Sequence, residues 1–295
     1  MKPLGSYKNG NYSVCIFSDG TKIRQNDSDS FIPDKPESID LKITNRCDMN
    51  CPMCHEDSTK DGAHADLSDV PFLDSLLPYT ELAIGGGNPL EHPHLVDFLT
   101  KCKRKRLVAN ITVNQTHFAK SQDEIAWLVS RGLVNGVGVS VTKVNDELLH
   151  LLQSYENAVV HVINGVIPME ELKKLYGRNL KLLILGYKDF RRGEGAHTDV
   201  TDKRMAEMYD ALPDLFRYFT TVSFDNLALR QLNVRRLVSD REWQSFYMGD
   251  DGQFTMYIDM VKREFAKSSI STERWPISGD IAEMFAVVNG RKLPA

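Results

Sequence analysis

An α/β fold built on parallel strands is predicted by the alternation of two kinds of segment along this 295-residue chain. Between residues 37 and 220, short runs rich in β-branched residues alternate with stretches of helical period, and the connections are short. About six such units follow one another, and right-handed crossovers would join their strands in parallel. Before residue 37 and after residue 220, this alternation of strand and helix patterns is not continued. We therefore expect an N-terminal part (1–36), a central α/β part (37–220) and a C-terminal extension (221–295) that covers the substrate side.

The N-terminal part has the pattern of a β-hairpin followed by a linker. Two alternating runs, 12–17 and 21–24, flank the turn sequence Ser18-Asp19-Gly20. A polar stretch with Pro33 and Pro36 then leads into the central part.

The central part supplies the expected strands and helices in order. Strands are predicted at 38–44, 81–84, 110–114, 138–141, 158–163 and 181–186. Helices are predicted at 69–77, 95–105, 122–131, 146–155, 169–175 and 203–212. In the extension we expect a further strand at 221–224, a helix at 239–247, and a second hairpin in which 246–248 pairs with 254–258 around the Gly249–Gly252 turn.

Net charge, apolar segments and cysteine content argue against several classes of function and location. The net charge of −4 gives no general attraction to nucleic acid or to an anionic membrane. No apolar stretch approaches the roughly 20 residues needed to span a bilayer, and the first residues lack the apolar core of a secretion signal. Five cysteines, three of them clustered, fit a reducing compartment better than a disulfide framework. We expect a cytoplasmic protein with no membrane partner.

Cys47, Cys51 and Cys54 form the most informative motif, a C-x3-C-x2-C run directly after the predicted strand 38–44. Three thiolates this close can bind three corners of one iron–sulfur cluster and leave its fourth iron open. The alternative is a structural zinc site in which His55 or His64 supplies the fourth ligand. No cysteine follows Cys102, so the sequence offers no thiolates for an auxiliary cluster in the extension.

Four segments together resemble the radical S-adenosylmethionine (radical SAM) family. The cysteine run matches the signature loop after the first barrel strand, and Glu81–Leu90, with its Gly85-Gly86-Gly87-Asn88-Pro89 turn, is similar to the second strand and its G-G-E-P turn. Residues 110–116 are similar to the third strand, and residues 138–141 to the fourth. The resemblance implies a partial (β/α)6 TIM-like barrel, and it covers about residues 37 to 220.

The resemblance also implies cofactors and their ligands. A 4Fe–4S cluster would be bound by the three cysteines, and S-adenosylmethionine (SAM) would lie beside it. Residues expected to contact SAM are Met53, Gly85, Gly86, Gly87, Asn88, Asn114 and Ser140. Asn114 and Ser140 could instead be polar strand ends satisfied by local hydrogen bonds. We expect a Cβ at Gly86 to clash with the cofactor more than with the fold.

Three residues are candidates for the substrate side. Lys42 shares one face of its strand with Asp40 and Thr44, and three polar groups on an inward face fit a barrel that holds a cofactor and a polar substrate. Arg191 and Arg192 lie in the charged, glycine-containing loop 187–195 that follows the sixth strand. We expect alanine at either arginine to slow substrate modification and to spare SAM cleavage.

The function implied by this resemblance is reductive cleavage of SAM to a 5'-deoxyadenosyl radical that abstracts hydrogen from a substrate. The extension, similar in faded form to those of peptide-modifying members, favours a peptide or protein substrate. A nucleotide or nucleobase is the alternative, based on the basic run 101–106 and the charged loop after Gly186. A non-catalytic zinc or iron–sulfur module is the alternative of another class. With no second redox centre in the sequence, an external one-electron donor such as flavodoxin is implied.

Overall fold

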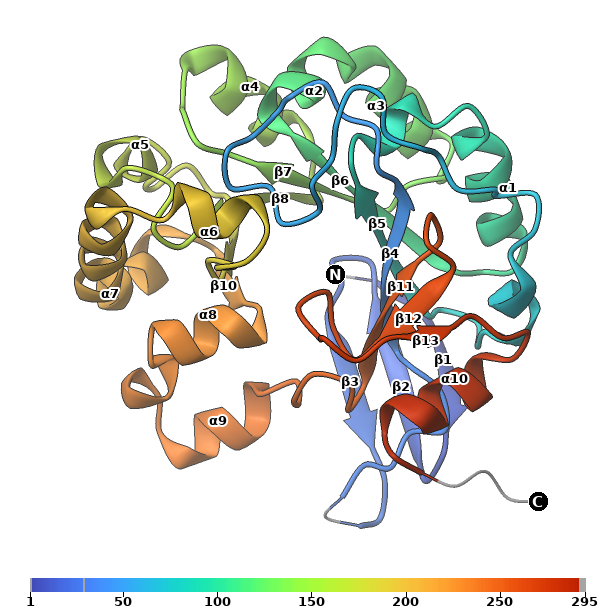
Figure 1. The fold of residues 1–295 in the computed structure, drawn as a ribbon. Coiled ribbons are helices and arrows are strands. Elements are labelled where there is room, and N and C mark those ends of the chain that lie inside the picture. Colours follow the sequence, from blue (N-terminus) through green and yellow to red (C-terminus); the bar gives the residue numbers. More distant parts are fainter. Residues whose placement is uncertain (1, 29, 292–295) are drawn as a thin grey trace.

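The computed structural model describes residues 2–28 and 30–291, and a curved ten-stranded sheet is its framework (Figure 1). Strand order across this sheet is β10-β9-β8-β7-β6-β5-β4-β11-β12-β13, so the sheet has two edges and does not close into a complete barrel. The predicted α/β fold with an open, partial barrel is confirmed. From β10 to β4, seven adjacent strands of the sheet run parallel: β4 (Ser38–Thr44), β5 (Glu81–Gly86), β6 (Val108–Asn114), β7 (Gly136–Ser140), β8 (Ala158–Ile163), β9 (Lys181–Leu185) and β10 (Thr221–Phe224).

The two faces of this sheet differ in residue type, because side chains alternate along a strand. One face carries fully buried aliphatic side chains such as Ile84, Ile111 and Val160, which belong to the main hydrophobic core. The other face lines the lumen of the open barrel with smaller or polar residues such as Ala83 and Thr112, which are only partly buried. The fold therefore leaves space inside the barrel for ligands.

Helices cover the outer face of the barrel (Figure 1). They are α1 (Leu95–Arg104), α2 (Gln115–Lys120), α3 (Gln122–Ser130), α4 (Asp146–Ser154), α5 (Met169–Lys173) and α7 (Asp199–Tyr218). The short helix α6 (Arg192–Ala196) lies instead in the loop after β9, against residues 50–58. The sequence predicted α1, α3, α4 and α5 to within two residues at each end, and missed the short helices α2 and α6. Residues 71–75 form a 3-10 helix, η1 (Pro71–Ser75), within the predicted helix 69–77.

The longest helix, α7, extends beyond its predicted limits at both ends. It begins after Thr198, where Thr198 and Thr201 form a reciprocal capping box. It also continues through the exposed Pro213 and ends six residues beyond the predicted limit at residue 212. The fully buried Leu212 and Leu215 lie on either side of the proline, so burial of this helix face outweighs the lost backbone hydrogen bond.

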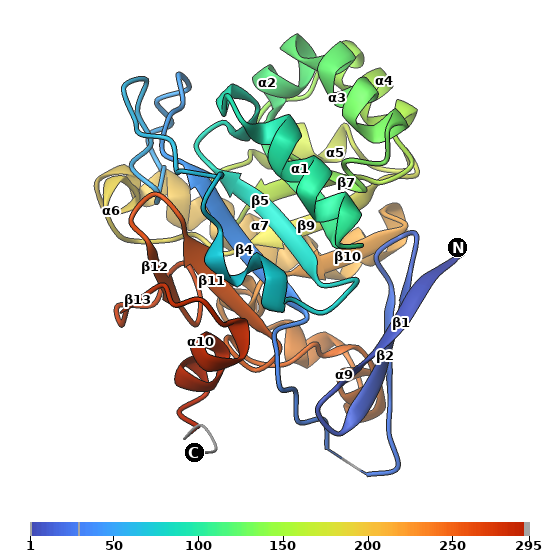
Figure 2. The same cartoon turned by 90° about the vertical axis from the view of Figure 1, so that its right-hand side faces the viewer.

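The N-terminal part is a separate three-stranded antiparallel sheet of β1 (Pro3–Asn9), β2 (Tyr12–Phe17) and β3 (Lys22–Gln25) (Figure 2). The predicted hairpin corresponds to β2 and β3, and β1 is an additional strand. Asp19, Gly20 and Thr21, at the β2–β3 turn, line the lumen cavity from below. Arg24 pairs with the buried Glu37 next to β4, with a 2.8 Å nitrogen–oxygen distance.

The C-terminal part adds three strands to the other side of β4: β11 (Thr255–Asp259), β12 (Glu264–Ala266) and β13 (Trp275–Pro276). It also contains α8 (Asn226–Gln231), η3 (Val234–Leu237), α9 (Asp240–Phe246) and α10 (Ile281–Val288). The expected hairpin between 246–248 and 254–258 is wrong. A capping box between Ser239 and Glu242 starts α9, which includes Phe246, and the real hairpin joins β11 to β12.

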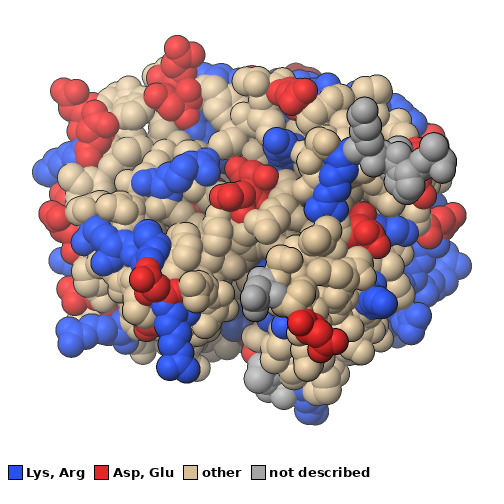
Figure 3. Space-filling model, turned by 90° about the horizontal axis from the view of Figure 1, so that it is seen from below, with Lys and Arg blue, Asp and Glu red and all other residues tan. Residues whose placement is uncertain are grey.

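The structure also shows the surface charge on one face and the apolar length of the helices. Seen from below, basic and acidic side chains are interspersed, and neither forms a continuous patch on that face (Figure 3). Among the residues that the structure describes, no helix has both the length and the apolar character required to cross a bilayer.

Candidate functional site

The three cysteines lie in a loop of residues 45–64, which we call the cysteine loop, at the carboxyl end of β4. Backbone contacts hold its stem closed, because Cys47 N–H donates to Thr59 O at 2.8 Å and Asn45 N–H donates to Ala63 O at 2.8 Å. Cys54 N–H donates to Cys51 O at 3.2 Å and forms a tight turn between those two cysteines. The local hydrogen bonds thus place all three thiols on one ordered loop.

The thiols of Cys47, Cys51 and Cys54 are free and partly exposed. Burial raises the pKa of Cys47 and of Cys51, and the neighbouring cysteines act in the same direction. Three thiolates at this loop would repel one another, so their ionisation calls for a bound cation or cationic cluster. The donor set therefore fits a metal centre.

The spacing of the sulfur atoms favours a cluster over one metal ion. Ligands of a single tetrahedral zinc lie about 4 Å apart, because each zinc–sulfur bond is about 2.3 Å. Within the described residues, only Cys47, Asp48 and His117 have ligand atoms that all lie within 4.8 Å of one another. The three cysteine sulfurs do not all lie within 4.8 Å of one another, so as they stand they are not placed as ligands of one zinc ion. His55 and His64, the expected fourth zinc ligands, hydrogen-bond instead to Lys188 (3.0 Å) and Thr44 (2.9 Å).

Asp48 and His117 connect the first cysteine to the barrel wall. His117 Nε2 lies 2.6 Å from Asp48 Oδ1, and the histidine is buried on α2. The hydrogen bond from His117 holds the pKa of the exposed Asp48 below its ordinary value. This contact anchors the start of the cysteine loop to the helix after β6.

The glycine turn after β5 packs against the cysteine loop. Gly87 N–H donates to Thr44 O at 2.8 Å and Asn88 N–H donates to Arg46 O at 2.7 Å. Gly86 has φ +114°, and a Cβ there would lie 2.3 Å from Thr44 O. The expectation that a Cβ at Gly86 would clash mainly with the cofactor is therefore wrong, because the first clash is with the backbone of β4.

The other residues of the turn have different surroundings. A Cβ at Gly87 would lie 2.1 Å from Arg46 O, so this glycine also serves the packing of the cysteine loop. Asn88 is buried and uses its amide locally, with Leu90 N–H and Glu91 Oε1 as partners. At Gly85, the nearest atom to a Cβ is Thr112 Cβ at 3.9 Å, so the lumen beside Gly85 is open.

Asn114 and Ser140 are the last residues of β6 and β7, and the structure places them side by side. They are register partners on adjacent parallel strands, and both are partly exposed. Asn114 Oδ1 accepts a 2.8 Å hydrogen bond from Thr116 N–H as the N-cap of α2, which is the local role considered above. Met53 lies in the cysteine loop between the second and third cysteines and is also partly exposed.

Lys42 is buried in a network centred on Glu56, a residue that the sequence did not single out. Lys42 Nζ lies 2.7 Å from Glu56 Oε2 and 3.2 Å from Asp259 Oδ2 on β11. Tyr257 donates to Glu56 Oε1 at 3.1 Å. Burial disfavours the charged form of Glu56, but His55 and Lys42 outweigh it and lower the pKa of Glu56. The ammonium of Lys42 is thus already paired with two carboxylates of the protein.

Arg191 and Arg192 extend from the start of α6 onto the cysteine loop. Arg191 Nη1 donates to His55 O at 2.6 Å, and Arg192 donates to Asn50 Oδ1 at 3.0 Å and to Ser58 O at 2.5 Å. The sequence suggested substrate contacts for both, whereas their guanidinium groups here hold the loop that carries the cysteines.

His161 is a second lumen residue that the sequence analysis missed. It lies on β8 opposite Ser140, and its ring packs over Gly138, where a Cβ would lie 2.2 Å from His161 Cε1. Burial lowers the pKa of His161 to about 4, so the ring is neutral at physiological pH. The alternation of side chains between the two faces of β8 could have placed His161 in the lumen, because its neighbours Val160 and Val162 face the core.

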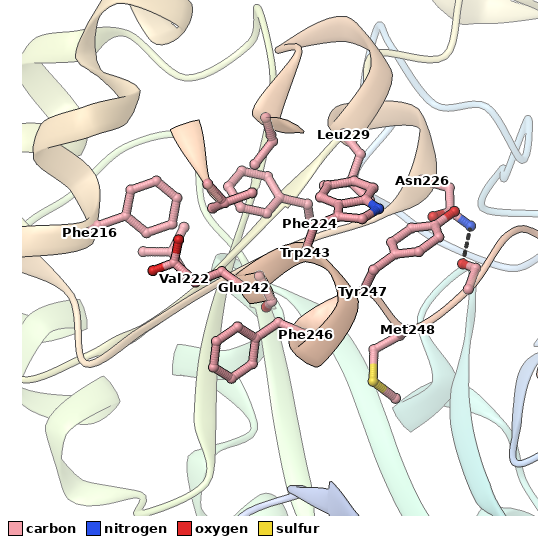
Figure 4. A pocket seen from close by; sticks show the side chains of 14 residues that line it. Phe216, Val222, Phe224, Asn226, Leu229, Glu242, Trp243, Phe246, Tyr247 and Met248 are labelled. Carbon is pink, nitrogen blue, oxygen red and sulfur yellow. Dashed lines mark hydrogen bonds between the residues drawn. The ribbon is translucent and has the colours of Figure 1, made fainter. Parts of the chain in front are cut away.

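Two cavities flank β10. The lumen cavity has a volume of about 550 Å³ and is lined by residues including Asn110, Thr112, His161, Lys181 and Ser223. A second, mainly apolar pocket of about 380 Å³ lies between α7, β10, α8 and α9 (Figure 4). Its lining includes Phe216, Phe224, Trp243 and Phe246, and Ser223 lines both cavities.

Similarity to curated proteins is distant. No protein-family model matches the chain. A tungsten-containing aldehyde ferredoxin oxidoreductase cofactor-modifying protein of Pyrococcus furiosus is 25% identical over 205 residues, covering 65% of this chain and 50% of that protein. The PqqA peptide cyclase of Gluconobacter oxydans is 27% identical over 85 residues, which cover 27% of this chain and 24% of the cyclase. The chain thus spans half or less of the length of these relatives.

Solved structures share the fold. SuiB of Streptococcus suis bound to its precursor peptide SuiA superposes with a TM-score of 0.58 over 88% of this chain and 67% of that chain, at 13% identity. SuiB bound to S-adenosylmethionine gives 0.57, with 83% of this chain and 64% of that chain covered at 13% identity. The relatives and the shared open-barrel fold confirm the predicted resemblance to the radical SAM family.

Proposed function

We propose that this chain is a radical SAM enzyme that cleaves SAM reductively at a 4Fe–4S cluster and abstracts hydrogen from a substrate. The observation that carries the proposal is the set of three free, partly exposed thiols on one ordered loop at the carboxyl end of β4. Ligand sites of α/β barrels lie at the carboxyl ends of the strands, so this loop is where a cofactor belongs.

Cys47, Cys51 and Cys54 would hold the cluster, and the rest of the site would position SAM. When bound and reduced, the cluster would supply one electron to SAM, whose carbon–sulfur bond would then break to give methionine and a 5'-deoxyadenosyl radical. Gly85 leaves open the lumen wall beside Thr112, and the side chains of Asn114 and Ser140 lie at the adjacent strand ends. These residues would orient SAM and limit its exposure to water. Met53, Gly86, Gly87 and Asn88 complete the proposed cofactor set, the last three chiefly by shaping the turn.

The test is anaerobic reconstitution with iron and sulfide, followed by measurement of bound iron, bound sulfide and 5'-deoxyadenosine. The wild-type protein should bind a four-iron cluster and form 5'-deoxyadenosine from SAM and a strong reductant. Alanine at Cys47, Cys51 or Cys54 should abolish that product. Cys15→Ala is the matched control, because Cys15 is also free and partly exposed but lies on β2. Wild-type product formation by a cysteine-loop variant would refute the proposal, as would preferential retention of zinc.

For the substrate, we propose a peptide or protein. Support comes from the relatives, since one is named a peptide cyclase and another is described with a precursor peptide. The apolar pocket beside β10 is suited to a bulky side chain of such a substrate (Figure 4). The nucleotide alternative has less support. In the basic run, Lys101 and Lys103 donate to backbone carbonyls and Lys105 pairs with Asp74, so these side chains are engaged locally.

The substrate class can be tested with a small-molecule and peptide extract of the source organism. The reconstituted protein is mixed with SAM, reductant and extract, and 5'-deoxyadenosine is followed over time. We expect the extract to stimulate product formation and a prior protease digestion to remove the stimulation. A stimulating fraction that survives protease but not nuclease would replace the peptide proposal with the nucleotide alternative.

We further propose a flavodoxin-type protein as electron donor and a cytoplasmic location. The five unpaired cysteines support a reducing compartment. The division at residues 36 and 220 stays a prediction from the sequence.

A further inference from the structure

The loop after β9 contacts the cysteine loop at several points. Besides the hydrogen bonds of Arg191 and Arg192, Lys188 Nζ lies 3.0 Å from His55 Nε2, and the Phe190 ring meets the His55 ring edge-on at 6.2 Å. A Cβ at Gly193 would lie 3.9 Å from Met53 O, so the backbones of the two loops are also close. The contacts involve both halves of the cysteine loop.

Arg192 makes the contact with the most specific geometry. Its Nη1 donates to the Asn50 side chain before Cys51, and its Nη2 donates to the Ser58 carbonyl after Cys54. One planar guanidinium therefore bridges two points of the loop that flank the second and third cysteines. A lysine has a single ammonium on a flexible stem and cannot reproduce this fork.

Arg191 adds a second observation, because its backbone is strained. Its φ of 53° and ψ of −130° are values that glycine adopts readily at the first central position of a type II′ turn. A non-glycine residue in such a conformation costs of order 1–3 kcal/mol and persists where surrounding contacts enforce it. The Arg191 side chain donates to His55 O at 2.6 Å and lies 3.7 Å from Glu56 Oε2, so the surrounding contacts of this residue are with the cysteine loop.

We propose that Arg191 and Arg192 are positioning residues that clamp the cysteine loop in its ligand-bearing conformation before any cluster binds. The clamp acts through the loop backbone and not through contact with substrate. The inference needs the cysteines to be metal ligands only for its second test, since the first test uses the metal-free chain.

The first test measures alkylation of each cysteine in the metal-free, reduced protein by iodoacetamide, with peptide mapping by mass spectrometry. In Arg192→Ala, we expect Cys54 to react about threefold faster or more, because the loop opens locally more often. The positive charge of Arg192 lowers the pKa of Cys51 and so favours its reactive thiolate, and for this reason Cys51 is compared in Arg192→Lys, which keeps the charge. Cys15 and the buried Cys102 serve as internal controls and should keep their wild-type rates. Arg204→Ala is the matched variant, because Arg204 Nη1 also donates to a backbone carbonyl, Val166 O at 2.9 Å, away from the cysteine loop.

An unchanged rate at Cys54 in Arg192→Ala would overturn the proposal. If Cys102 also reacts faster, the variant has lost its fold, and Arg192→Lys then decides. That variant keeps the charge and the aliphatic stem but not the bridge. Faster reaction confined to Cys51 and Cys54 supports the clamp, and wild-type rates refute it.

The second test loads the protein with iron and sulfide. We expect Arg192→Ala and Arg192→Lys to retain less than about half of the wild-type iron per chain, because metal affinity includes the free energy of organising the ligands. The electron paramagnetic resonance signal of the reduced cluster should broaden in both variants and stay wild-type in Arg204→Ala. Absence of a cluster in the wild-type protein would refute the proposed function, whereas the alkylation result would still decide the clamp.

Discussion

Two adjacent glycines at the end of β5, Gly85 and Gly86, show that neighbouring glycines can have different structural roles. A Cβ at Gly86 would meet Thr44 O at 2.3 Å, in a backbone conformation with positive φ, whereas a Cβ at Gly85 would meet only Thr112 Cβ at 3.9 Å. Gly86 therefore lets two backbone segments pass closely, and Gly85 keeps the lumen wall open. A glycine-rich motif in the sequence does not separate these two roles, because both residues look alike until their neighbours are known.

This contrast predicts opposite phenotypes for two valine substitutions. Gly86→Val should cost at least about 2 kcal/mol and lower the melting temperature by about 4 °C or more. Gly85→Val should leave the melting temperature nearly unchanged but raise the SAM dissociation constant about tenfold, or about 1.4 kcal/mol. Thermal unfolding and equilibrium SAM binding on the reconstituted proteins check both. Wild-type SAM affinity in Gly85→Val would remove Gly85 from the cofactor site.

His161 predicts a pH dependence of stability. Its pKa is lowered to about 4 in the folded protein by burial, while an unfolded histidine titrates near pH 6.5. Between these values the unfolded chain binds the proton more readily, so the contribution of His161 to stability falls as the pH decreases through this window. By about pH 5 the loss should reach at most about 2 kcal/mol.

The check is urea unfolding of wild type and His161→Gln at about pH 7 and about pH 5. Glutamine does not titrate, so the variant should lose less stability on acidification than wild type does. His150→Gln on α4 is the control for the substitution itself, since it replaces an exposed histidine by glutamine in the same way. Equal acid sensitivity in His161→Gln and wild type would mean that His161 is solvated in the folded state.

At the scale of elements, β11 ties the end of the chain to its first barrel strand. It pairs in parallel with β4 over five residue pairs, and its side chains Tyr257 and Asp259 reach Glu56 and Lys42. The sequence placed this strand in a hairpin with 246–248, because a glycine-rich turn between two aromatic runs is typical of hairpins. Instead, Ser239 caps helix α9, which includes Phe246, and β11 pairs with the edge of the sheet that β4 supplies.

If β11 is an integral strand, substitutions in it should affect global stability. Ile258 is fully buried in β11, and Ile258→Ala should destabilise the protein by about 2–5 kcal/mol through lost burial and a cavity. Ile23 on β3 is 52% exposed, and Ile23→Ala should change stability by less than about 0.5 kcal/mol. Urea unfolding followed by circular dichroism measures both. A small effect at Ile258 would show that the C-terminal strands are dispensable for the barrel.

At the scale of the whole molecule, the features that could be predicted from the sequence are those specified by residues close together in the chain. The strands and most barrel helices follow from periodicity, and the cysteine loop follows from its spacing, because each signal lies within a few residues. The contacts that organise the site are not local. Tyr257 reaches Glu56 across 201 positions, and Arg192 reaches Ser58 across 134. No short pattern specifies such pairs, since the curvature of the sheet brings them together.

The same long-range contacts predict how the molecule unfolds. Trp127 on α3 and Trp275 on β13 report on distant parts of one continuous sheet and its helix layer, so their unfolding transitions should coincide. Trp243 lies on α9, which has no buried residue and borders the apolar pocket, so it should respond at lower urea concentration.

Variants with a single tryptophan, the other two replaced by phenylalanine, test this order by fluorescence. The unfolding midpoints at Trp127 and Trp275 should agree within error, with the midpoint at Trp243 lower. An independent, earlier transition at Trp275 would contradict the continuous sheet, because it would mean that β11 to β13 unfold while β4 stays folded. It would also favour the division near residue 220 as a true domain boundary, because separate domains unfold in separate transitions. Coincident midpoints at all three tryptophans would instead place α9 and its pocket in the same cooperative unit as the barrel.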